Sequence, residues 1–291
     1  MQYGPATPAE RQIAAKDRTT MTELNDYRGR WALVTGAGDG IGRALTLAFA
    51  RQGMNVVASD IRADAAASVA QEAEALGVQA KANTADVADR AAMMQAAEQL
   101  AADGIVPSIL WANAGVGVAA NTTDASPRTV EWVLSVNIFG VVWTTQAFVP
   151  RMLATTGPRH VGVTASSASI VNVRGPFTLY AASKQGTAGI AEALSAELTP
   201  KGIGVTILYP GMLNTNIWDS ARARPERFGG ERRMAENVGD PWRKTPGPEV
   251  IVEPVLRTIA KGGGRCVVDA MGEARPLFEA KTEALRAAFD A

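Results

Sequence analysis

The amino-acid sequence predicts an α/β fold: a doubly wound parallel sheet of about seven strands between two helical layers, in a single domain. Short apolar runs alternate with longer helical stretches along most of the 291 residues. Several of these runs are continuously apolar, as in strands that are covered on both faces. A glycine-rich turn follows the first run, at the place where such sheets bind ligands.

The expected strands and helices follow one another in a regular order. We expect strands at residues 31–35, 55–59, 79–83, 108–112, 160–165, 205–209 and 266–269. We expect helices between them at residues 41–52, 64–76, 89–102, 127–154, 179–199 and 248–261. Because successive parallel strands need a long crossover connection, this alternation favours a parallel sheet with helices on both faces.

Two segments fall outside this pattern. Residues 1–26 lack the apolar core of a secretory signal, and we expect a disordered tail there, followed by one domain at residues 27–291. The connection at residues 212–245 is too long for an ordinary loop and carries prolines, glycines and many charges. We therefore expect it to form a lid over the substrate. No run approaches the ~18 apolar residues of a membrane span.

Composition excludes several kinds of site. The chain has 29 basic and 29 acidic side chains, so no charge excess attracts nucleic acid or an anionic membrane, and neither partner is expected. A single cysteine, Cys266, cannot form an internal disulfide, which favours a cytoplasmic location. A single histidine, His160, excludes sites that need two histidines, and we interpret it as structural. The acidic residues show no metal-ligand spacing, so no metal is expected.

The glycine-rich turn comes directly after the first expected strand. Its glycines are Gly36, Gly38, Gly40 and Gly42. Glycines allow a tight turn, bring backbone N–H groups close to a pyrophosphate, and place a helix N-terminus beside it. There is no Gly-Lys-Ser/Thr, which argues against a nucleotide triphosphatase loop. A plain structural turn is the alternative interpretation.

An acidic residue at the end of the second expected strand supports dinucleotide binding. Asp60 lies where a carboxylate would bond the adenosine ribose hydroxyls. It would also repel a 2′-phosphate, and Asp39 in the glycine turn adds a second negative charge. These two carboxylates outnumber Arg62, so NAD is favoured over NADP. A simple turn residue is the alternative for Asp60.

A serine, a tyrosine and a lysine form a candidate catalytic group. Tyr180 and Lys184 are four residues apart in an expected helix, so they share a face. A nearby ammonium lowers a tyrosine pKa, which would let Tyr180 exchange a proton with an alcohol or ketone. Ser167 follows the fifth expected strand and could hold the reacting oxygen. We interpret Ser166 and Ser169 as loop-capping residues.

In this order, the motifs resemble those of the short-chain dehydrogenase/reductase family, in its single-domain, NAD-preferring branch. The resemblance runs from about residue 27 to the C-terminal helix and implies a Rossmann-type fold. The residues that match the cofactor-binding motifs are Gly36, Gly38, Asp39, Gly40, Ile41, Gly42, Asp60, Ile61, Asp86, Val87, Asn113, Ala114, Gly115, Tyr180, Lys184, Pro210, Gly211 and Thr215. The residues that match the catalytic set are Asn137, Ser167, Tyr180 and Lys184.

The resemblance also implies a mechanism. NAD⁺ would accept hydride from a secondary alcohol while Tyr180 removes the hydroxyl proton. Lys184 would lower the Tyr180 pKa and bond the nicotinamide ribose, and Ser167 would polarise the oxygen. Asn137 would connect Lys184 to solvent through a water molecule. In the family, the helix at 127–154 and the helix bearing Tyr180 form a four-helix interface, so we expect a homotetramer, with a dimer as the alternative.

The lid suggests a bulky substrate. Its apolar residues would form the walls of a substrate site, which favours an aryl or alicyclic alcohol over a small polyol. The expected wall residues in the lid are Met212, Leu213, Trp218, Phe228 and Trp242, and those expected across the cleft are Val173 and Phe177. The sequence after Pro210 is similar to a branch that acts on such alcohols. We expect the basic residues at 222–244 to belong to a solvated, salt-laced helix rather than to bind a substrate carboxylate.

Two rival functions stay open at this point. The first is an NADPH-dependent reductase of 3-oxoacyl chains, which Asp39 and Asp60 oppose. The second is a non-catalytic NAD(H)-binding sensor, which would not require Ser167 and Tyr180 together. The leading hypothesis is an NAD(H)-dependent oxidoreductase acting on a small-molecule secondary alcohol or ketone.

Overall fold

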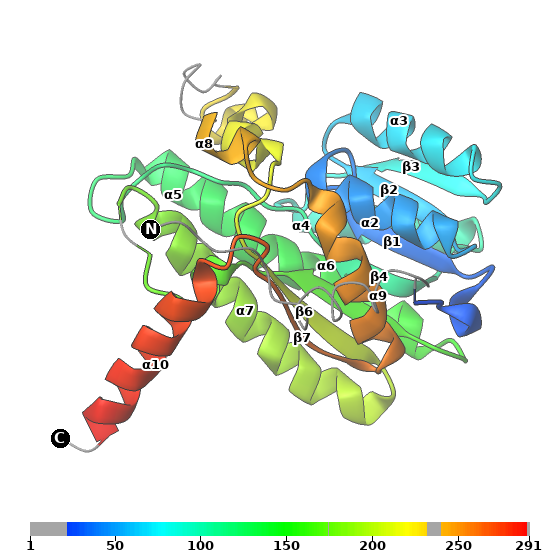
Figure 1. The fold of residues 1–291 in the computed structure, drawn as a ribbon. Helices are drawn as coiled ribbons and strands as arrows, with labels where there is room; N and C mark the ends of the chain where they lie inside the picture. Colours follow the sequence, from blue (N-terminus) through cyan, green and yellow to red (C-terminus); the bar gives the residue numbers. More distant parts are fainter. Residues whose placement is uncertain (1–21, 174, 232–239, 290–291) are drawn as a thin grey trace.

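The sheet has the predicted seven parallel strands, and it lies between two layers of helices (Figure 1). A computed structural model describes residues 22–173, 175–231 and 240–289. The strand order is β3-β2-β1-β4-β5-β6-β7. The strands are β1 Trp31–Thr35, β2 Asn55–Asp60, β3 Ala80–Thr84, β4 Pro107–Ala112, β5 His160–Thr164, β6 Gly204–Pro210 and β7 Gly263–Val268. The predicted fold class is thus confirmed.

Each face of the sheet is covered by its own helices and its own apolar cluster. On one face, the cluster joins α2 Gly40–Arg51, α3 Ala63–Glu74 and α9 Val252–Ala260 to the strands. On the other, it joins α4 Arg90–Ala102, α5 Pro127–Leu134, α6 Gly140–Leu153 and α7 Thr178–Leu198. Because β1, β4 and β5 contact helices on both faces, their side chains are almost all buried.

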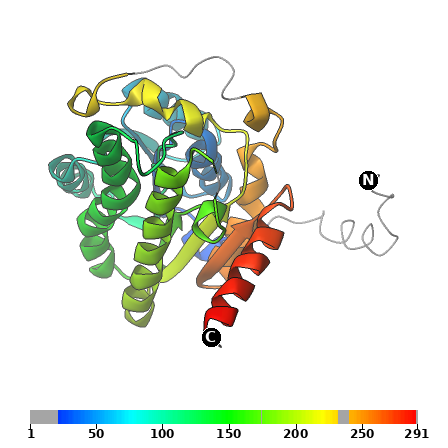
Figure 2. The ribbon, with the colours of Figure 1, turned by 90° about the vertical axis from the view of Figure 1, so that its left-hand side faces the viewer.

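Further helices, most of them short, connect and extend these layers. They are η1 Asn25–Tyr27, η2 Ser135–Phe139, η3 Ser167–Ser169, η4 Thr199–Lys201, η5 Asn216–Ala223, η6 Glu226–Phe228, α8 Asp240–Arg243, η7 Pro248–Ile251 and α10 Ala274–Phe289. In Figure 2, η5 and η6 lie across the top of the molecule, and α10 runs down along its edge. The expected lid therefore has helical structure in its first part, while its residues 232–239 lie outside the described residues.

The strands are added toward one edge of the sheet from β1 to β3 and toward the other edge from β4 to β7. β1 pairs with β2 on one side and with β4 on the other. From this point the crossovers run toward opposite edges of the sheet, which leaves a crevice at the carboxyl ends of the strands. The glycine-rich turn begins at this point.

One long helical segment carries Asn137. It consists of α5, a single π-helical stretch η2, and α6. By length and composition this segment, Pro127–Leu153, could cross a membrane, contrary to the expectation that no segment would, but 61% of its most apolar window is buried inside the fold. Burial of that kind is typical of a core helix.

Residues 22–26 pack against the domain, contrary to the prediction. Leu24 is 3% exposed, and the backbone N–H and hydroxyl of Thr22 donate to the carboxylate of Glu253 on α9. The tail predicted for residues 1–26 is thus wrong for residues 22–26, and residues 1–21 lie outside the described residues. At the other end, α10 is capped by Asp269 but leaves Leu277 and Phe278 largely exposed.

Candidate functional site: a dinucleotide-sized cleft with a buried tyrosine and lysine

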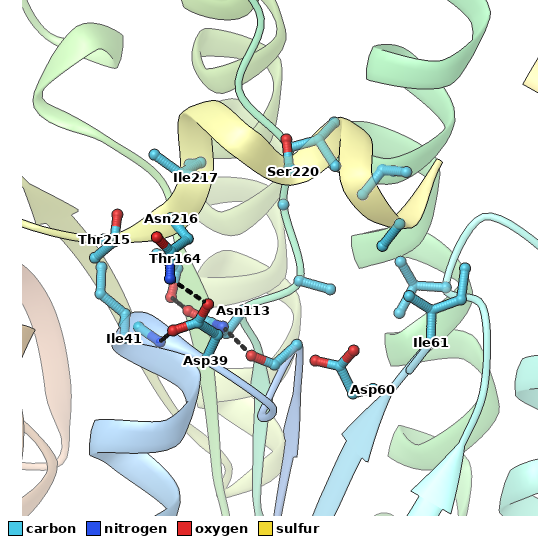
Figure 3. A pocket seen from close by; sticks show the side chains of 18 of the residues that line it. Asp39, Ile41, Asp60, Ile61, Asn113, Thr164, Thr215, Asn216, Ile217 and Ser220 are labelled. Atoms are coloured by element: carbon cyan, nitrogen blue, oxygen red, sulfur yellow. Dashed lines mark hydrogen bonds between the residues drawn. The ribbon is translucent and has the colours of Figure 1, made fainter. Parts of the chain in front are cut away.

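A cleft lies at the carboxyl ends of the central strands (Figure 3). We call residues 35–42 with the ends of β1, β2 and β4 the floor, and residues 215–228 the roof. The predicted site residues that line the cleft are Gly36, Asp39, Gly40, Ile41, Asp60, Ile61, Asp86, Val87, Asn113, Ala114, Gly115, Tyr180, Lys184, Pro210 and Thr215. The other predicted site residues, Gly38, Gly42, Gly211, Asn137 and Ser167, are not among the residues that line it.

Close backbone packing requires glycine in the floor. A Cβ atom on Gly42 would lie 2.0 Å from the carbonyl oxygen of Gly36. A Cβ atom on Gly38 would lie 2.8 Å from the Asp60 carboxylate, and Gly36 itself has a φ of +63°. The floor is therefore bare backbone beside the N-terminus of α2. Such a cradle fits the pyrophosphate of a dinucleotide, because helix N-termini present N–H groups and partial positive charge.

The two carboxylates of the floor face different partners. Asp60, which is 8% exposed, accepts hydrogen bonds from the N–H groups of Gly38 and Arg62, both at 2.9 Å. It also forms an ion pair with the Arg62 side chain at 3.6 Å. Asp39 instead caps α2 through the N–H of Gly40 and turns toward Asn216 in the roof (Figure 3). Only Asp60 therefore occupies the position expected for a ribose ligand.

Ile61, Asp86 and Val87 also line the cleft. Val87 packs so closely on Gly140 that a Cβ there would lie 2.8 Å from the valine. Asp86 accepts a hydrogen bond from the N–H of Ala88 at 2.9 Å. Contact of Asp86 and Val87 with adenine stays a prediction.

Asn113 joins three neighbouring strands at the centre of the floor. Its side-chain amide donates to the carbonyl of Thr35 at 3.0 Å, and its oxygen accepts from the hydroxyl of Thr164 at 3.0 Å. Behind it, a Cβ atom on Gly115 would lie 3.2 Å from the Lys184 ammonium nitrogen. The turn after β4 therefore keeps open the space beside the lysine.

Tyr180 and Lys184 project from α7 to the base of the cleft. The ammonium of Lys184 is buried and donates to the carbonyl of Thr164 at 2.9 Å. Burial lowers the pKa of Lys184 to about 8. Burial also raises the pKa of Tyr180 to about 12, against a hydrogen bond from Ser166 that lowers it. In this structure burial thus outweighs the lowering of the Tyr180 pKa that was expected from Lys184.

Two adjacent serines follow β5. The Ser166 hydroxyl accepts from the N–H of Ala168 at 3.1 Å, so Ser166 caps η3, as expected. A hydrogen bond from Ser166 also opposes the effect of burial on the pKa of Tyr180. Ser167 begins η3 and is half-buried.

Asn137 is held from several sides in the π-helical stretch. Its side chain accepts from the N–H of Val116 at 2.8 Å and donates to the Val116 carbonyl at 3.0 Å and to the Ser183 hydroxyl at 2.9 Å. Its own carbonyl accepts from Thr187 at 2.7 Å. Asn137 thus fixes the turn after β4 against α7, next to the lysine-bearing face.

The roof places aromatic rings above the tyrosine. The ring centroid of Trp218 lies 5.3 Å from that of Tyr180 and 4.9 Å from those of Phe177 and Trp242. Three of the expected wall residues thus gather at Tyr180. Leu213 and Phe228 instead belong to the buried core clusters. Aromatic rings in this arrangement form an apolar surface that favours an apolar substrate.

The roof also covers the cofactor side of the cleft, which the sequence did not predict. Residues 215–217, 220, 222, 223 and 225 line the same cleft as Asp39, Asp60 and Asp86. The hydroxyl of Ser220 and the carbonyl of Ile217 both accept from the N–H of Gly117. The expected lid over the substrate is therefore also a lid over the glycine turn.

Three arginines of the roof are engaged rather than solvated. Arg222 forms an ion pair with Asp39 at 2.8 Å, and Arg227 pairs with Asp86. Arg224 is 6% exposed, and its guanidinium lies 4.8 Å from the ring centroid of Trp132. The ion pairs of Arg222 and Arg227 agree with the salt-laced segment that was expected, although their partners lie far away in the sequence, whereas the buried Arg224 departs from that expectation.

Several cleft residues were not singled out from the sequence for this role. They include Thr164, Asn216, Ser220 and Arg222. Asn216 and Arg222 carry no motif, and only their contacts with Asp39 mark them.

A profile of the short-chain dehydrogenase family matches residues 30–226. The chain is 35% identical to cyclohexanol dehydrogenase of Acinetobacter sp. strain SE19, over 66% of this chain and 76% of that protein. It is 36% identical to galactitol 2-dehydrogenase of Cereibacter sphaeroides, over 70% of this chain and 81% of that protein. These relatives act on different kinds of alcohol.

Solved structures give the same fold. A short-chain dehydrogenase/reductase from Burkholderia phymatum in complex with NAD has a TM-score of 0.76 and 28% identity, over 83% of this chain and 89% of that chain. A metagenomic short-chain oxidoreductase in complex with NADP has a TM-score of 0.60 and 28% identity, over 64% of this chain and 83% of that chain. Similar structures therefore hold either nicotinamide cofactor.

Proposed function

Because this chain belongs to the short-chain dehydrogenase/reductase family of oxidoreductases, we propose that it interconverts a secondary alcohol and its ketone with NAD(H). The observation that carries the proposal is the position of the Tyr180 side chain. It lies at the base of the cleft, with Ser166 and Lys184 beneath and beside it and Trp218 above it. A proton-transferring hydroxyl at that place suits an alcohol or a ketone.

In the proposed reaction, Tyr180, a serine and Lys184 each have a separate role. Tyr180 takes the hydroxyl proton of the alcohol in oxidation and returns it to the ketone oxygen in reduction. Ser167 keeps the oxygen-positioning role expected of it, and Ser166, whose hydrogen bond opposes the burial effect on the Tyr180 pKa, is the alternative for that role. Lys184, held at the Thr164 carbonyl, is close enough to the cleft to bond a ribose hydroxyl. The bound nicotinamide supplies hydride transfer.

The Asn137 relay supports proton exchange with solvent in this proposal. Its side chain is fully used by Val116 and Ser183, so the group left for a water molecule is its backbone carbonyl. Thr187 already donates to that carbonyl, which has a second lone pair available. A water molecule there would connect Lys184 to solvent.

The preference for NAD now rests on one carboxylate. Asp60 is buried at the ribose position and would repel a 2′-phosphate. The Arg62 ion pair offsets part of that charge. Asp39 no longer adds to the argument, because its carboxylate is paired with Arg222 and turned away from Asp60. We therefore expect NAD⁺ to be favoured over NADP⁺ by about tenfold in kcat/KM.

The aromatic rings around Trp218 support a bulky aryl or alicyclic substrate. Trp218 in the roof, together with Trp242 and Phe177 outside it, presents ring faces and edges near Tyr180 and few polar groups that would bind a polyol. The relative that acts on cyclohexanol fits this class, whereas galactitol dehydrogenase belongs to the polyol class. The aromatic surface is what favours the first.

A panel of aryl, alicyclic, steroid and sugar secondary alcohols tests the proposal. Each alcohol is incubated with NAD⁺ or NADP⁺, and absorbance of the reduced nicotinamide is followed. We expect ring-bearing alcohols with NAD⁺ to react fastest. Faster turnover with NADP⁺ would contradict the Asp60 argument, and a preference for sugar alcohols would contradict the aromatic argument.

Tyr180→Phe is the matched control for this panel. It removes one hydroxyl from a buried ring and keeps the ring packing on Trp218. We expect turnover to fall by about 10³-fold or more while NADH binding is kept. Unchanged turnover would refute the assignment of Tyr180. Tight NADH binding with no alcohol turnover in the wild-type chain would favour the non-catalytic sensor.

A homotetramer stays part of the proposal. Phe139 is 48% exposed and stacks on Trp143 at 5.8 Å between ring centroids, next to the start of α6. An exposed aromatic pair on this helix is suited to contact between subunits. Sedimentation velocity of the wild-type chain and of Phe139→Glu would test it, with a loss of tetramer expected in the variant.

A cytoplasmic location is likewise proposed. It rests on the single cysteine, Cys266, which is 5% exposed and cannot pair within the chain. Fractionation of the producing cells tests this. Recovery of the protein outside the cytoplasm would contradict it.

A further inference from the structure

Arg222 is a positively charged residue of the roof that reaches the glycine-turn side of the cleft. Its guanidinium donates to the carboxylate of Asp39 at 2.8 Å, although the two residues are 183 positions apart. It also donates to the carbonyls of Asn216 at 3.0 Å and Asp219 at 2.9 Å. The side chain is therefore fixed in direction, and it lines the same cleft as the floor.

The charge on Asp39 is poorly placed for a dinucleotide unless it is compensated. Asp39 is the N-cap of α2, and the N-terminus of this helix is where the diphosphate would lie. A carboxylate there repels an anion. Asn216 donates one hydrogen bond at 2.8 Å but brings no charge. Arg222 brings the positive charge.

The other cations that line the described part of the cleft serve different positions. Arg62 is paired with Asp60 at the ribose end. Lys184 is bonded to the carbonyl of Thr164 below Tyr180. Of the three lining cations, only Arg222 lies at the N-terminus of α2.

We propose that Arg222 is a cofactor-binding residue that supplies the positive charge for the diphosphate of the dinucleotide. The inference rests on the nicotinamide-dinucleotide binding in the proposed function. Its planar guanidinium has donors left after the Asp39 bond, so it can bond a phosphate oxygen while it keeps Asp39 compensated. The roof thus contributes a residue to cofactor binding, and cofactor binding in turn holds the roof in place.

The alternative is that Arg222 acts only as a latch that holds the roof closed through Asp39. The two roles predict opposite results for the two partners of the ion pair. If Arg222 is only a latch, Asp39→Asn and Arg222→Gln both break it and weaken binding alike. If Arg222 binds the diphosphate, Asp39→Asn removes a repulsive charge and leaves the guanidinium free to bind.

The experiment measures the Kd of NADH by its fluorescence, without any alcohol present. We expect Arg222→Gln to raise this Kd by about tenfold and to reduce its dependence on salt. We expect Asp39→Asn to lower it by severalfold. Asparagine is as good an N-cap as aspartate, so α2 keeps its cap. Arg222→Lys keeps the charge and should fall between Arg222→Gln and wild type.

Two competitors of NADH locate the effect. ADP-ribose carries the diphosphate, and adenosine carries none. We expect Arg222→Gln to weaken the binding of ADP-ribose by about the same factor as the binding of NADH, and to leave the binding of adenosine unchanged. Equal weakening of adenosine, or equal weakening of NADH by Asp39→Asn and Arg222→Gln, would overturn the proposal in favour of a latch.

The readout also separates this inference from the proposed reaction. A chain that binds NADH but turns over no alcohol would contradict only the reaction, and the comparison of variants would still be decisive for Arg222. A wild-type chain that binds neither NADH nor NADPH would overturn both. Thermal unfolding of each variant, within a few degrees of wild type, checks that a weaker Kd does not come from loss of fold.

Discussion

The floor of the cleft is fixed by contacts between backbone atoms, whereas the roof is held by side-chain pairs. In the floor, Gly42 meets the carbonyl of Gly36 so closely that no side chain fits. In the roof, Arg222 and Arg227 reach Asp39 and Asp86 through single ion pairs at partly exposed positions. Exposed pairs are individually weak. We infer that the floor is rigid and the roof adjustable, and the following changes test that contrast.

The largest effect is expected in the floor. Gly42→Ala would place a Cβ atom 2.0 Å from a backbone oxygen, so the turn must move. We expect NADH binding to weaken by more than about 100-fold and the free energy of unfolding to fall by about 3 kcal/mol. Fluorescence titration and urea unfolding measure the two quantities.

Gly189→Ala is the control for that change. Gly189 lies in α7, and a Cβ atom there has no neighbour within 4 Å. This substitution should raise the free energy of unfolding by about 0.5–1 kcal/mol, since alanine favours a helix over glycine. Normal NADH binding by Gly42→Ala would show that the floor is not rigid.

The next effect distinguishes the two adjacent serines that follow β5. Ser167→Ala removes the hydroxyl expected to hold the reacting oxygen, and we expect kcat to fall by about 100-fold with NADH binding kept. Ser166→Ala is its matched control, with less than about a threefold change in kcat. A larger loss from Ser166→Ala than from Ser167→Ala would give the role to Ser166, whose hydrogen bond opposes the burial effect on the Tyr180 pKa.

A third effect concerns stability alone and comes from His160, which lies at the end of the sheet opposite the cleft. Burial lowers the pKa of His160 to about 3, so between pH 6.5 and 3 the unfolded chain binds a proton that the folded chain does not. Stability from this residue is therefore lost as the pH falls through that window. Its slope is about 1.4 kcal/mol per pH unit.

His160→Gln removes that titration. Glutamine can replace the hydrogen bond between His160 Nε2 and the Thr206 hydroxyl at 2.8 Å. The free energy of unfolding, measured by urea between pH 7 and 4, should fall less steeply with acid in the variant. Parallel curves would mean that the folded chain accepts the proton on His160.

The smallest effect is expected in the roof. Trp218→Ala removes one ring from the group around Tyr180, and we expect KM for a ring-bearing alcohol to rise by about threefold to tenfold. Propan-2-ol, which is too small to reach the ring, should keep its KM. An equal rise in KM for both alcohols would mean that Trp218 positions the Tyr180 side chain rather than forming a surface for the substrate.

The same contrast explains which parts could be predicted from the sequence. The strands and the glycine turn were predictable because burial on two faces and close backbone approach impose residue types locally. The predicted strand at 31–35 coincides with β1, and the glycines lie in the floor. Tyr180 and Lys184 were predictable because helical spacing alone places them on one face.

Side-chain pairing across the chain was not predictable. Ser166 and Ser167 are adjacent and of the same residue type, so local sequence alone cannot separate their roles at Tyr180. Salt bridges were expected for the arginines at 222–227, but nothing near them in sequence marks Asp39 and Asp86 as partners or predicts the burial of Arg224.

The sequence by itself determined the α/β fold, the seven strands in their order along the chain, the bare glycine floor, and the tyrosine–lysine pair. These follow from local spacing and from the patterns of burial that strands and helices require. Only the tertiary structure decided that the lid covers the glycine turn, that Asp39 is paired with Arg222, and that Arg227 is paired with Asp86. Each of these depends on where residues distant in the chain come to lie, which packing of the whole domain determines.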